Sequence, residues 1–160
     1  MELRVSIVRQ EMTLLDDASE VLRSYLICTA AKGVGELYGS FCTPRGRHLI
    51  RAKIGADLPE NAVFVRRRPT GEVYTQELAV QFPERDWILT RILWLSGCEP
   101  GINRLGCVDS QRRKIYIHGS PDDQKMGEPS SHGCIRMRNA DIVELFDLVP
   151  PYTAVDIFAD

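Results

Sequence analysis

The chain of 160 residues carries 20 basic and 22 acidic side chains, for a formal net charge of −2, and 44% of its residues are hydrophobic. This composition favours one globular domain, residues 1–160, large enough to bury a core. The near balance of charge indicates neither nucleic acid nor an anionic membrane surface as a partner. No apolar run reaches the length of a membrane span.

The first residues alternate in polarity from Leu3 to Arg9 and include two arginines. They do not supply the apolar core, about 7 to 15 residues long, of a secretory signal. As written, the chain is expected to stay in the cytoplasm, and a periplasmic location is the alternative if a leader has been removed. The five cysteines include no CxxC pair, which suits a reducing compartment better than a disulfide framework.

Short strand-like runs separated by turn residues follow one another along most of the chain. Turns are indicated by residues 16–17, 32–33, 44–46, 69–71 and 100–101. Strands are predicted over residues 4–10, 12–15, 21–29, 48–54, 63–65, 72–75, 88–95 and 114–118. This regular spacing is typical of a mainly β domain.

One helix is predicted near the C-terminus, over about residues 140–149. Apolar residues recur there at i, i+3, i+4 and i+7, as Ile142, Leu145, Phe146 and Val149. Asn139 or Asp141 is the candidate N-cap, and the two prolines at 150 and 151 would end the helix. A last strand over residues 153–158 would complete the sheet.

Two short blocks carry the chemistry that the sequence indicates. His118-Gly119 ends an apolar run, and Cys134 lies in the block Ser131-His132-Gly133-Cys134-Ile135-Arg136. A thiol is only a few per cent thiolate at neutral pH, so a nucleophilic cysteine needs an imidazole or another positive influence nearby. The period of two places Ile115 and Ile117 on one strand face and Tyr116 and His118 on the other.

Gly133 precedes the cysteine and removes a side chain from the turn. The backbone is then free to turn tightly, so that the N–H groups of Gly133 and Cys134 point at one oxyanion. The sequence therefore predicts a cysteine nucleophile with a histidine base and an oxyanion site.

These residues resemble the L,D-transpeptidase catalytic domain, the YkuD type. The resemblance rests on the His118-Gly119 pair and on the Ser131 to Arg136 block, which matches the Ser/Thr-x-Gly-Cys-x-Arg motif. The turn at residues 43–46, Thr-Pro-Arg-Gly, is similar to the family's Thr-Pro-x-Gly turn. His48 departs from the family's usual aromatic residue, and we expect it to be structural. The resemblance implies a β-sandwich-like domain with one C-terminal helix and a final strand.

The resemblance implies a role for each residue of the two blocks. Cys134 would attack the carbonyl of a stem-peptide diamino acid, joined through its L-centre to D-alanine, and form a thioester while D-alanine leaves. His118 would act as the base, and the Gly119 carbonyl would hold its other ring nitrogen. His132 would line the site and help to shape the oxyanion pocket. The expected substrates are peptidoglycan-derived tetrapeptides or muropeptides, with carbapenem-type compounds as inhibitors.

The resemblance extends to the residues that surround the reacting groups. Ser131 would brace the turn, and Arg136 would organise the loop or meet a substrate carboxylate. Tyr116 is a further candidate for substrate contact. The stretch from Gly101 to Gly106 is similar to a subfamily loop near the substrate, which makes Asn103 and Arg104 candidates as well. The implied mechanism requires no metal and no organic cofactor.

The acceptor of the acyl group decides the reaction. Without an export signal, the chain would meet soluble muropeptides and water, so hydrolysis is the favoured outcome. This is L,D-carboxypeptidase action, the trimming of a tetrapeptide to a tripeptide during muropeptide recycling. The alternative is L,D-transpeptidation, which forms 3-3 cross-links or exchanges D-amino acids in the wall. A noncatalytic module that binds stem peptides is an alternative of another class.

Other uses of these residues are less favoured. His118, His132 and Cys134 could ligate zinc, but no CxxC pair and no Glu-bearing histidine motif accompanies them. The remaining cysteines are interpreted as small apolar residues rather than nucleophiles.

Overall fold

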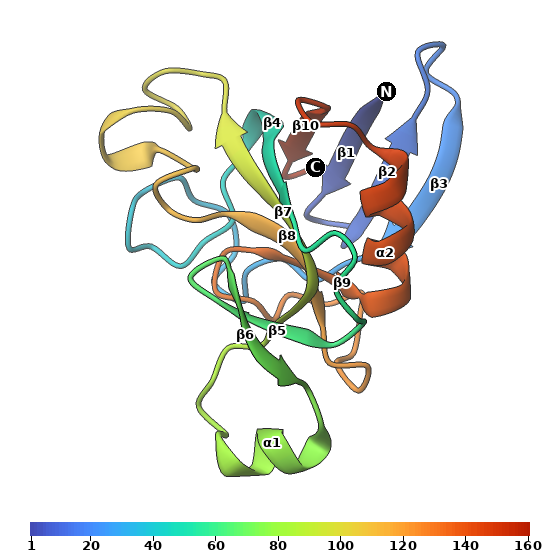
Figure 1. Ribbon diagram of the computed structural model, residues 1–160. Coiled ribbons are helices and arrows are strands. Elements are labelled where there is room, and N and C mark those ends of the chain that lie inside the picture. The colour runs from blue at the N-terminus through green and yellow to red at the C-terminus, as the bar shows by residue number, and fades with distance from the viewer.

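A computed structural model describes residues 1–160 and confirms the mainly β class (Figure 1). Ten strands, two α-helices and one short 3-10 helix make up the fold. The strands are β1 (Glu2–Ser6), β2 (Glu11–Leu15), β3 (Val21–Leu26), β4 (Gly46–Ile54), β5 (Ala62–Val65), β6 (Arg68–Val73), β7 (Ile88–Gly97), β8 (Tyr116–Ser120), β9 (Ile135–Arg138) and β10 (Ala154–Phe158). The helices are α1 (Gln76–Gln81), α2 (Asn139–Leu148) and the 3-10 turn η1 (Gly106–Val108).

All ten strands are hydrogen-bonded into one continuous sheet. The main path runs β3-β2-β1-β10-β4-β7-β5-β6, and β8 and β9 branch from β7. Only two pairs, β1 with β10 and β8 with β9, are parallel. In Figure 1 the sheet curls, so that β7 and β8 cross the middle of the molecule while β1, β2 and β3 stand beside α2. The β-sandwich-like domain expected from the sequence is thus built from a single curled sheet.

The main core lies between the curled sheet and α2. It contains 19 buried side chains, drawn from both ends of the chain. Ile142, Leu145 and Phe146 of α2 are buried in it, as the i, i+3, i+4 spacing predicts. The helix packs against β7, β8 and β9, which are the strands that carry the two blocks of the predicted site.

Three short elements were not predicted: α1, β9 and the 3-10 turn η1. Helix α1 has no buried residue and projects from one end of the molecule (Figure 1), so no apolar stripe marks it in the sequence. It begins where the Thr75 side chain accepts a hydrogen bond from the Leu78 N–H. Strand β9 is only four residues long and alternates isoleucine and methionine with arginines.

One predicted turn is wrong. Residues 69–71, expected as a turn because of Pro69 and Gly71, lie in β6. The β5–β6 hairpin turns instead at Arg66 and Arg67, which both have positive φ angles, 52° and 65°. Positive φ at both central residues is typical of a type I′ hairpin turn. Arginine is an uncommon residue there, which is why the sequence did not mark it.

The predicted cap of the C-terminal helix is also wrong. Helix α2 begins at Asn139, and the residue before it, Arg138, makes no side-chain capping bond. Asn139 is buried, and its amide bonds to the side chains of Asn61, Thr90 and Asp122 instead. Neither α-helix has the length and the apolar run that would let it cross a bilayer.

Candidate active site

Strand β8 presents His118 on the face away from the main core. Ile115 and Ile117 belong to the main core, and His118 is buried on the opposite face. Its Nδ1 lies 2.6 Å from the Gly119 carbonyl oxygen. Because a carbonyl can only accept, Nδ1 carries the proton and Nε2 keeps its lone pair. The geometry that the sequence predicted for His118 and Gly119 is therefore present.

Gly119 has no space for a side chain. A Cβ atom there would lie 2.7 Å from the Leu89 carbonyl oxygen and would clash with Oδ1 of Asn139. Asn139 in turn accepts a hydrogen bond from the Thr90 hydroxyl at 2.6 Å. The end of β8 is thus held close to β7 and to the start of α2, and the carbonyl that orients His118 is fixed with it.

The turn that carries the cysteine is held by its own serine. The Ser131 hydroxyl donates to the Cys134 carbonyl at 2.5 Å and accepts from the Gly133 N–H at 3.2 Å. Gly133 has φ = +129°, a backbone conformation that residues with a Cβ rarely adopt. Ser131 braces the turn as the resemblance implies.

A threonine from a distant segment supports the same turn. Thr43 is fully buried, and its hydroxyl donates to the Gly133 carbonyl at 2.9 Å. The same hydroxyl accepts from the Ala30 N–H at 2.9 Å. The Thr-Pro-Arg-Gly turn at residues 43–46 therefore contributes to the site as a brace.

Strand pairing brings the two sequence blocks together. In the parallel β8–β9 pair, His118 lies opposite Arg136. Cys134 directly precedes β9, and its side chain packs against the cluster that contains Tyr116, which shares a face of β8 with His118. On its other side, the segment pairs with Cys28 through two backbone hydrogen bonds. The Cys28 N–H donates to the Arg136 carbonyl, and the Arg136 N–H donates to the Cys28 carbonyl.

The thiol of Cys134 is bonded to the backbone at the start of β8. Its sulfur accepts from the Tyr116 N–H at 3.3 Å and donates to the Lys114 carbonyl at 3.3 Å. Burial raises the pKa of Cys134 to about 12, although the Tyr116 N–H and the charges of Arg136 and Arg113 act in the opposite direction. The resting form is therefore a neutral thiol, whose proton is directed at Lys114 and not at His118.

His118 is also neutral at rest. Burial lowers its pKa, and the nearby charge of Arg136 lowers it further. Asp86 and the Gly119 carbonyl act against this shift. A neutral imidazole with a free Nε2 is the form that can accept a proton.

Asp86 is the acidic group of the site, and it enters from the loop after α1. Its carboxylate lies 3.0 Å from the guanidinium of Arg136 and 3.7 Å from Nδ1 of His132. Partial burial of the Asp86 side chain, which is 40% exposed, would raise its pKa, but the protonated form of His118 and the guanidinium of Arg136 outweigh this effect and lower the pKa. Asp86 is therefore a carboxylate at neutral pH.

Arg136 organises the loop before the cysteine. Its side chain is only 14% exposed and donates to the Ser130 carbonyl at 3.1 Å. His132 is the opposite case, because its side chain is 66% exposed. The ring of His132 lies edge-on to Phe41, with 6.4 Å between the ring centres, so it forms part of the rim of the site.

The expected pair of oxyanion donors is only half available. The Gly133 N–H is already bonded to the Ser131 hydroxyl, which corrects its predicted role. The Cys134 N–H has no acceptor within the protein. The His132 N–H has no acceptor within the protein either, so these two backbone donors of the turn are free to bind an oxyanion.

The candidate substrate residues lie in three different environments. Tyr116 is buried beside Cys134, and its hydroxyl accepts from Arg67 at 3.1 Å. Asn103 is fully buried, and its amide bonds to the backbone of Arg45, Arg47 and Glu99. The structure therefore makes Asn103 a brace of its loop and not a substrate contact. Arg104 is exposed on the same loop, outside the surface hollows at His132.

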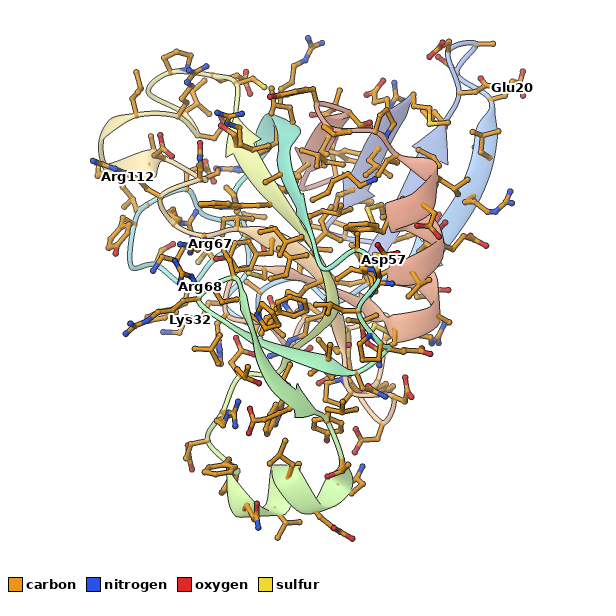
Figure 2. All side chains as sticks on the ribbon, viewed as in Figure 1. Glu20, Lys32, Asp57, Arg67, Arg68 and Arg112 are labelled. Carbon is orange, nitrogen blue, oxygen red and sulfur yellow. The ribbon has the colours of Figure 1, made fainter.

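Three hollows in the surface share His132 in their walls. The first is formed by Tyr38, Gly39, Phe41, Arg112, Arg113, Lys114, Ile115 and His132. The second lies between Lys32, Phe41 and Ser131. The third, on the side of Asp86, includes Trp87, Gln124 and Arg136. In Figure 2, Lys32, Arg67, Arg68 and Arg112 lie on the side of the molecule away from α2, whereas Glu20 marks the β2–β3 turn.

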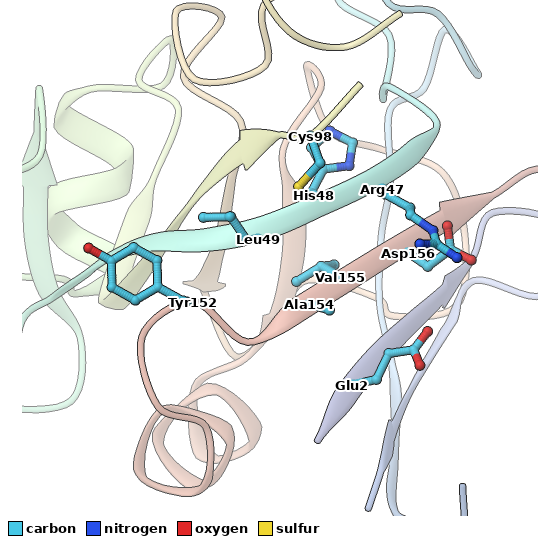
Figure 3. A pocket seen from close by; sticks show the side chains of 9 residues that line it. All are labelled: Glu2, Arg47, His48, Leu49, Cys98, Tyr152, Ala154, Val155 and Asp156. Carbon is cyan, nitrogen blue, oxygen red and sulfur yellow. The ribbon is translucent and has the colours of Figure 1, made fainter. Parts of the chain in front are cut away.

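A separate pocket lies on the outer face of β1, β10 and β4 (Figure 3). Its walls include Tyr152, Val155, Arg47 and Cys98, and none of the predicted catalytic residues. His48 borders it but is buried, with its ring nitrogens 3.0 Å from the Gly46 carbonyl and 2.8 Å from the Ser110 hydroxyl. His48 is structural, as expected. No group of three or more His, Cys, Asp or Glu side chains is placed to hold a metal ion.

Four residues of the site were missed or assigned no role from the sequence. They are Thr43, Asp86, Arg113 and Asn139. Arg113 is half-buried and donates to the carbonyls of Gly35 and Cys42, which fixes the segment in front of the cysteine turn. The Thr-Pro-Arg-Gly motif could have indicated Thr43, but no motif surrounds Asp86 or Arg113.

Comparison with known proteins assigns a family to this arrangement. The family model described as the L,D-transpeptidase catalytic domain matches residues 2–157. The protein named as an L,D-transpeptidase, YkuD, of Bacillus licheniformis is 46% identical over 41 residues, which is 26% of this chain and 25% of that protein. The chain thus matches about a quarter of the length of this curated relative.

Solved structures share the fold at low sequence identity. An L,D-transpeptidase from Mycobacterium smegmatis matches with a TM-score of 0.58 and 16% identity, over 98% of this chain and 58% of that one. L,D-transpeptidase 3 from Mycobacterium tuberculosis, solved with a faropenem-derived adduct, matches with a TM-score of 0.58 and 15% identity, over 97% and 58% of the two chains.

Proposed function

The chain belongs to the L,D-transpeptidase catalytic-domain family, and from this membership we propose that it transfers acyl groups of peptidoglycan stem peptides through a thioester on Cys134. The observation that carries the proposal is the pairing of β8 with β9. It supports the proposal because the residue next to β9, Cys134, packs against Tyr116 on the face of β8 that also carries His118, and Gly119 fixes the tautomer of His118.

The first step begins from two neutral groups. When a substrate enters, the thiol turns from the Lys114 carbonyl towards Nε2 of His118 and gives up its proton there. The sulfur attacks the carbonyl carbon that joins the L-centre of the diamino acid to D-alanine. The Cys134 N–H stabilises the oxyanion that forms. His118 is an imidazolium at this stage.

The second step releases D-alanine. The tetrahedral intermediate collapses, the C–N bond breaks, and the imidazolium donates its proton from Nε2 to the leaving amine. The acyl group remains on the sulfur as a thioester, and His118 is again neutral. It can then take a proton from the next acceptor, so each proton taken up by His118 is returned within the cycle.

The charges around the hollows favour an anionic substrate. Lys32, Arg112 and Lys114 line the hollows on one side of His132. A stem peptide carries free carboxylates that such a rim attracts. We therefore propose a peptidoglycan-derived tetrapeptide or muropeptide as the acyl donor. We expect a β-lactam such as a carbapenem to acylate the same sulfur; the similar structures include one with imipenem, a carbapenem, and one with an adduct derived from the penem faropenem.

We propose water as the main acceptor. Water needs no dedicated binding site beside the thioester, whereas a peptide amine must be held in a productive position. Hydrolysis gives a tripeptide, the outcome of an L,D-carboxypeptidase. This activity belongs to recycling of soluble muropeptides, and a cytoplasmic location goes with it as part of the same proposal.

Transpeptidation is the second candidate. It is favoured by one observation, which is that hollows lie on both sides of His132. Two peptide chains could enter from these two sides and meet at the thioester. The location that goes with this candidate is the periplasmic wall.

Product analysis tests the proposal. The protein is incubated with a disaccharide tetrapeptide, with and without a D-amino acid as acceptor, and the products are separated and weighed. Hydrolysis predicts a tripeptide and free D-alanine in both reactions, and neither product with Cys134→Ala. Cross-linked or exchanged products alone would contradict hydrolysis and support the second candidate. Binding without any turnover would contradict acyl transfer and indicate a noncatalytic stem-peptide module.

A further inference from the structure

We propose that Asp86 is a positioning residue of the active site, which stabilises the protonated form of His118 while the thiolate of Cys134 attacks. This inference rests on the proposed function, because it gives Asp86 a part in the same proton transfer. Asp86 lies outside both motif blocks, on the loop between α1 and β7.

The first observation is where the carboxylate lies. Cys134 has His132 two residues before it and Arg136 two residues after it. Asp86 contacts both of these neighbours, Arg136 at 3.0 Å and His132 at 3.7 Å. It therefore bridges the two residues that flank the nucleophile. The Arg136 contact is the better defined, because that guanidinium is only 14% exposed.

The second observation is how Arg136 relates to His118. The two residues are direct neighbours across the β8–β9 pair. A lone guanidinium there would oppose a positive charge on the imidazole. The single negative charge of Asp86 offsets the positive charge of Arg136 beside His118. Among the charges that act on His118, Asp86 favours the protonated ring and has the larger influence, and Arg136 opposes it.

The charges around the thiol complete the arrangement. Arg136 and Arg113 favour the thiolate of Cys134, and Asp86 opposes it. Asp86 is the largest charged influence on both groups, and on His118 it favours the protonated ring. Because Asp86 pairs with Arg136, the strand neighbour of His118, we place its main effect on the imidazole, where it favours proton transfer from Cys134.

The neighbourhood of Asp86 leaves few other charged groups to consider. Arg85 is turned away, because it pairs with Glu72 at 2.9 Å and lies over the ring of Trp87. Asp123 is bonded to Gln76 at the start of α1. The titratable or charged groups that face the thiol and the base are Asp86, Arg136, Arg113, Tyr116 and the two histidines His118 and His132.

The test measures the reactivity of Cys134 without any substrate. Wild type and Asp86→Asn are alkylated with iodoacetamide at a series of pH values, and the rate at Cys134 is read by peptide mass analysis. Cys98 and Cys107 are exposed and serve as internal references. Glu77→Gln, on the exposed first turn of α1, is the control for loss of one negative charge.

The expected result has two parts. The plateau rate at Cys134 falls on the order of 10-fold in Asp86→Asn, as part of the 10²- to 10⁴-fold that a positioned base contributes. The acid limb of the profile also moves to lower pH. The carboxylate stabilises the state in which both the thiol and the imidazole are protonated, so its loss lowers the pKa at which this pair gives up its first proton. Asp86→Glu restores most of the rate, and Glu77→Gln behaves as wild type.

Three results would overturn the inference. They are an unchanged profile in Asp86→Asn, a lower rate with an unmoved acid limb, and an equal effect of Glu77→Gln. A lower rate alone would mean that Asp86 only braces the loop.

A spectroscopic readout separates this inference from the proposed function. The His118 ring is titrated by NMR, with its signal assigned by His118→Gln. Asp86→Asn should lower the midpoint even if the protein turns over no stem peptide. An unchanged midpoint would contradict the role of Asp86 even if wild type is an active enzyme.

Discussion

At the scale of single residues, the site depends on which nitrogen of His118 carries the proton. The Gly119 carbonyl lies 2.6 Å from Nδ1 and holds the proton on that nitrogen. An enzyme with a catalytic triad uses a carboxylate in this position. A backbone carbonyl brings no negative charge to the imidazole. The charge comes instead from Asp86, whose carboxylate reaches the site through Arg136 and His132. Orientation and charge are thus supplied by different groups.

Gly119→Ala should damage both stability and reactivity. The added Cβ would crowd the Leu89 carbonyl at 2.7 Å and the Asn139 amide, and the backbone cannot move without changing the carbonyl that holds His118. We expect a loss of about 1 to 3 kcal/mol of unfolding free energy, measured by urea denaturation. The alkylation rate of Cys134 should fall in parallel. Wild-type stability in this variant would contradict the close packing at position 119.

The buried histidines predict a loss of stability in acid. Burial lowers the pKa of both His48 and His118 below the ordinary value of 6.5. The unfolded chain therefore binds protons more readily, so the stabilising contribution is fully present above pH 6.5 and is lost as the pH falls below it. Urea unfolding from pH 8 to pH 5 should show this decline.

His48→Gln separates one of these two contributions. It should flatten the decline in acid, because one buried imidazole is gone. It should also cost about 1 to 3 kcal/mol at pH 8, because the Ser110 hydroxyl loses its buried partner. An equally steep decline in the variant would show that His48 does not contribute.

At the scale of elements, the cysteine turn is held between β8 and the segment after β3. Backbone bonds join Cys28 to Arg136 and Ala31 to Ser131. The Thr43 hydroxyl links the same segment to the turn, because it accepts a hydrogen bond from the Ala30 N–H and donates one to the Gly133 carbonyl. The position of Cys134, the proposed nucleophile, is therefore set by three separate parts of the chain.

Thr43→Val tests this brace with little change of shape. Loss of the buried hydroxyl leaves the Ala30 N–H and the Gly133 carbonyl without partners, which should cost about 1 to 3 kcal/mol by urea denaturation. The alkylation rate of Cys134 should also fall. Thr13→Val in β2, where the side chain makes no hydrogen bond, is the matched control and should be close to wild type. Equal behaviour of the two variants would contradict the brace.

The elements differ in how far the sequence predicts them. β4 and β7 carry alternating apolar residues and were found with small shifts at their ends, and α2 was found from its apolar stripe. β9 was not predicted because only two of its four residues are apolar, and they alternate with arginines. One of these arginines, Arg136, braces the loop before Cys134 instead of lying on a solvent face. Asn139 has the composition of a cap, but burial directs its amide to three side chains of other segments.

The residues of the site also divide into those that the sequence predicts and those that it does not. Cys134, His118 and the residues beside them form recognisable blocks, because their chemistry requires particular neighbours. Asp86 and Arg113 are brought to the site only by the curl of the sheet, and a single acid or base in a loop has no local pattern. Asn103 was assigned to substrate because of its loop, but its amide bonds to Glu99 in that loop and to the backbone of Arg45 and Arg47 at the start of β4.

At the scale of the whole molecule, one curled sheet gathers segments from most of the chain around a single thiol. The parallel β8–β9 pair sets the two reacting groups, and the remaining segments supply the brace, the charge and the rim. Lys32, Arg112 and Lys114 border the hollows at His132 although the net charge is slightly negative. The molecule is therefore expected to draw anionic peptides to this side.

The central claim is that Cys134 is an acylating nucleophile, and the mass of the intact protein after incubation with a carbapenem such as imipenem tests it most directly. The account predicts one covalent adduct, mapped to the peptide that contains Cys134. The adduct should be absent in Cys134→Ala and retained in Cys107→Ala. Absence of an adduct in the wild type, or an adduct that persists in Cys134→Ala, would contradict it.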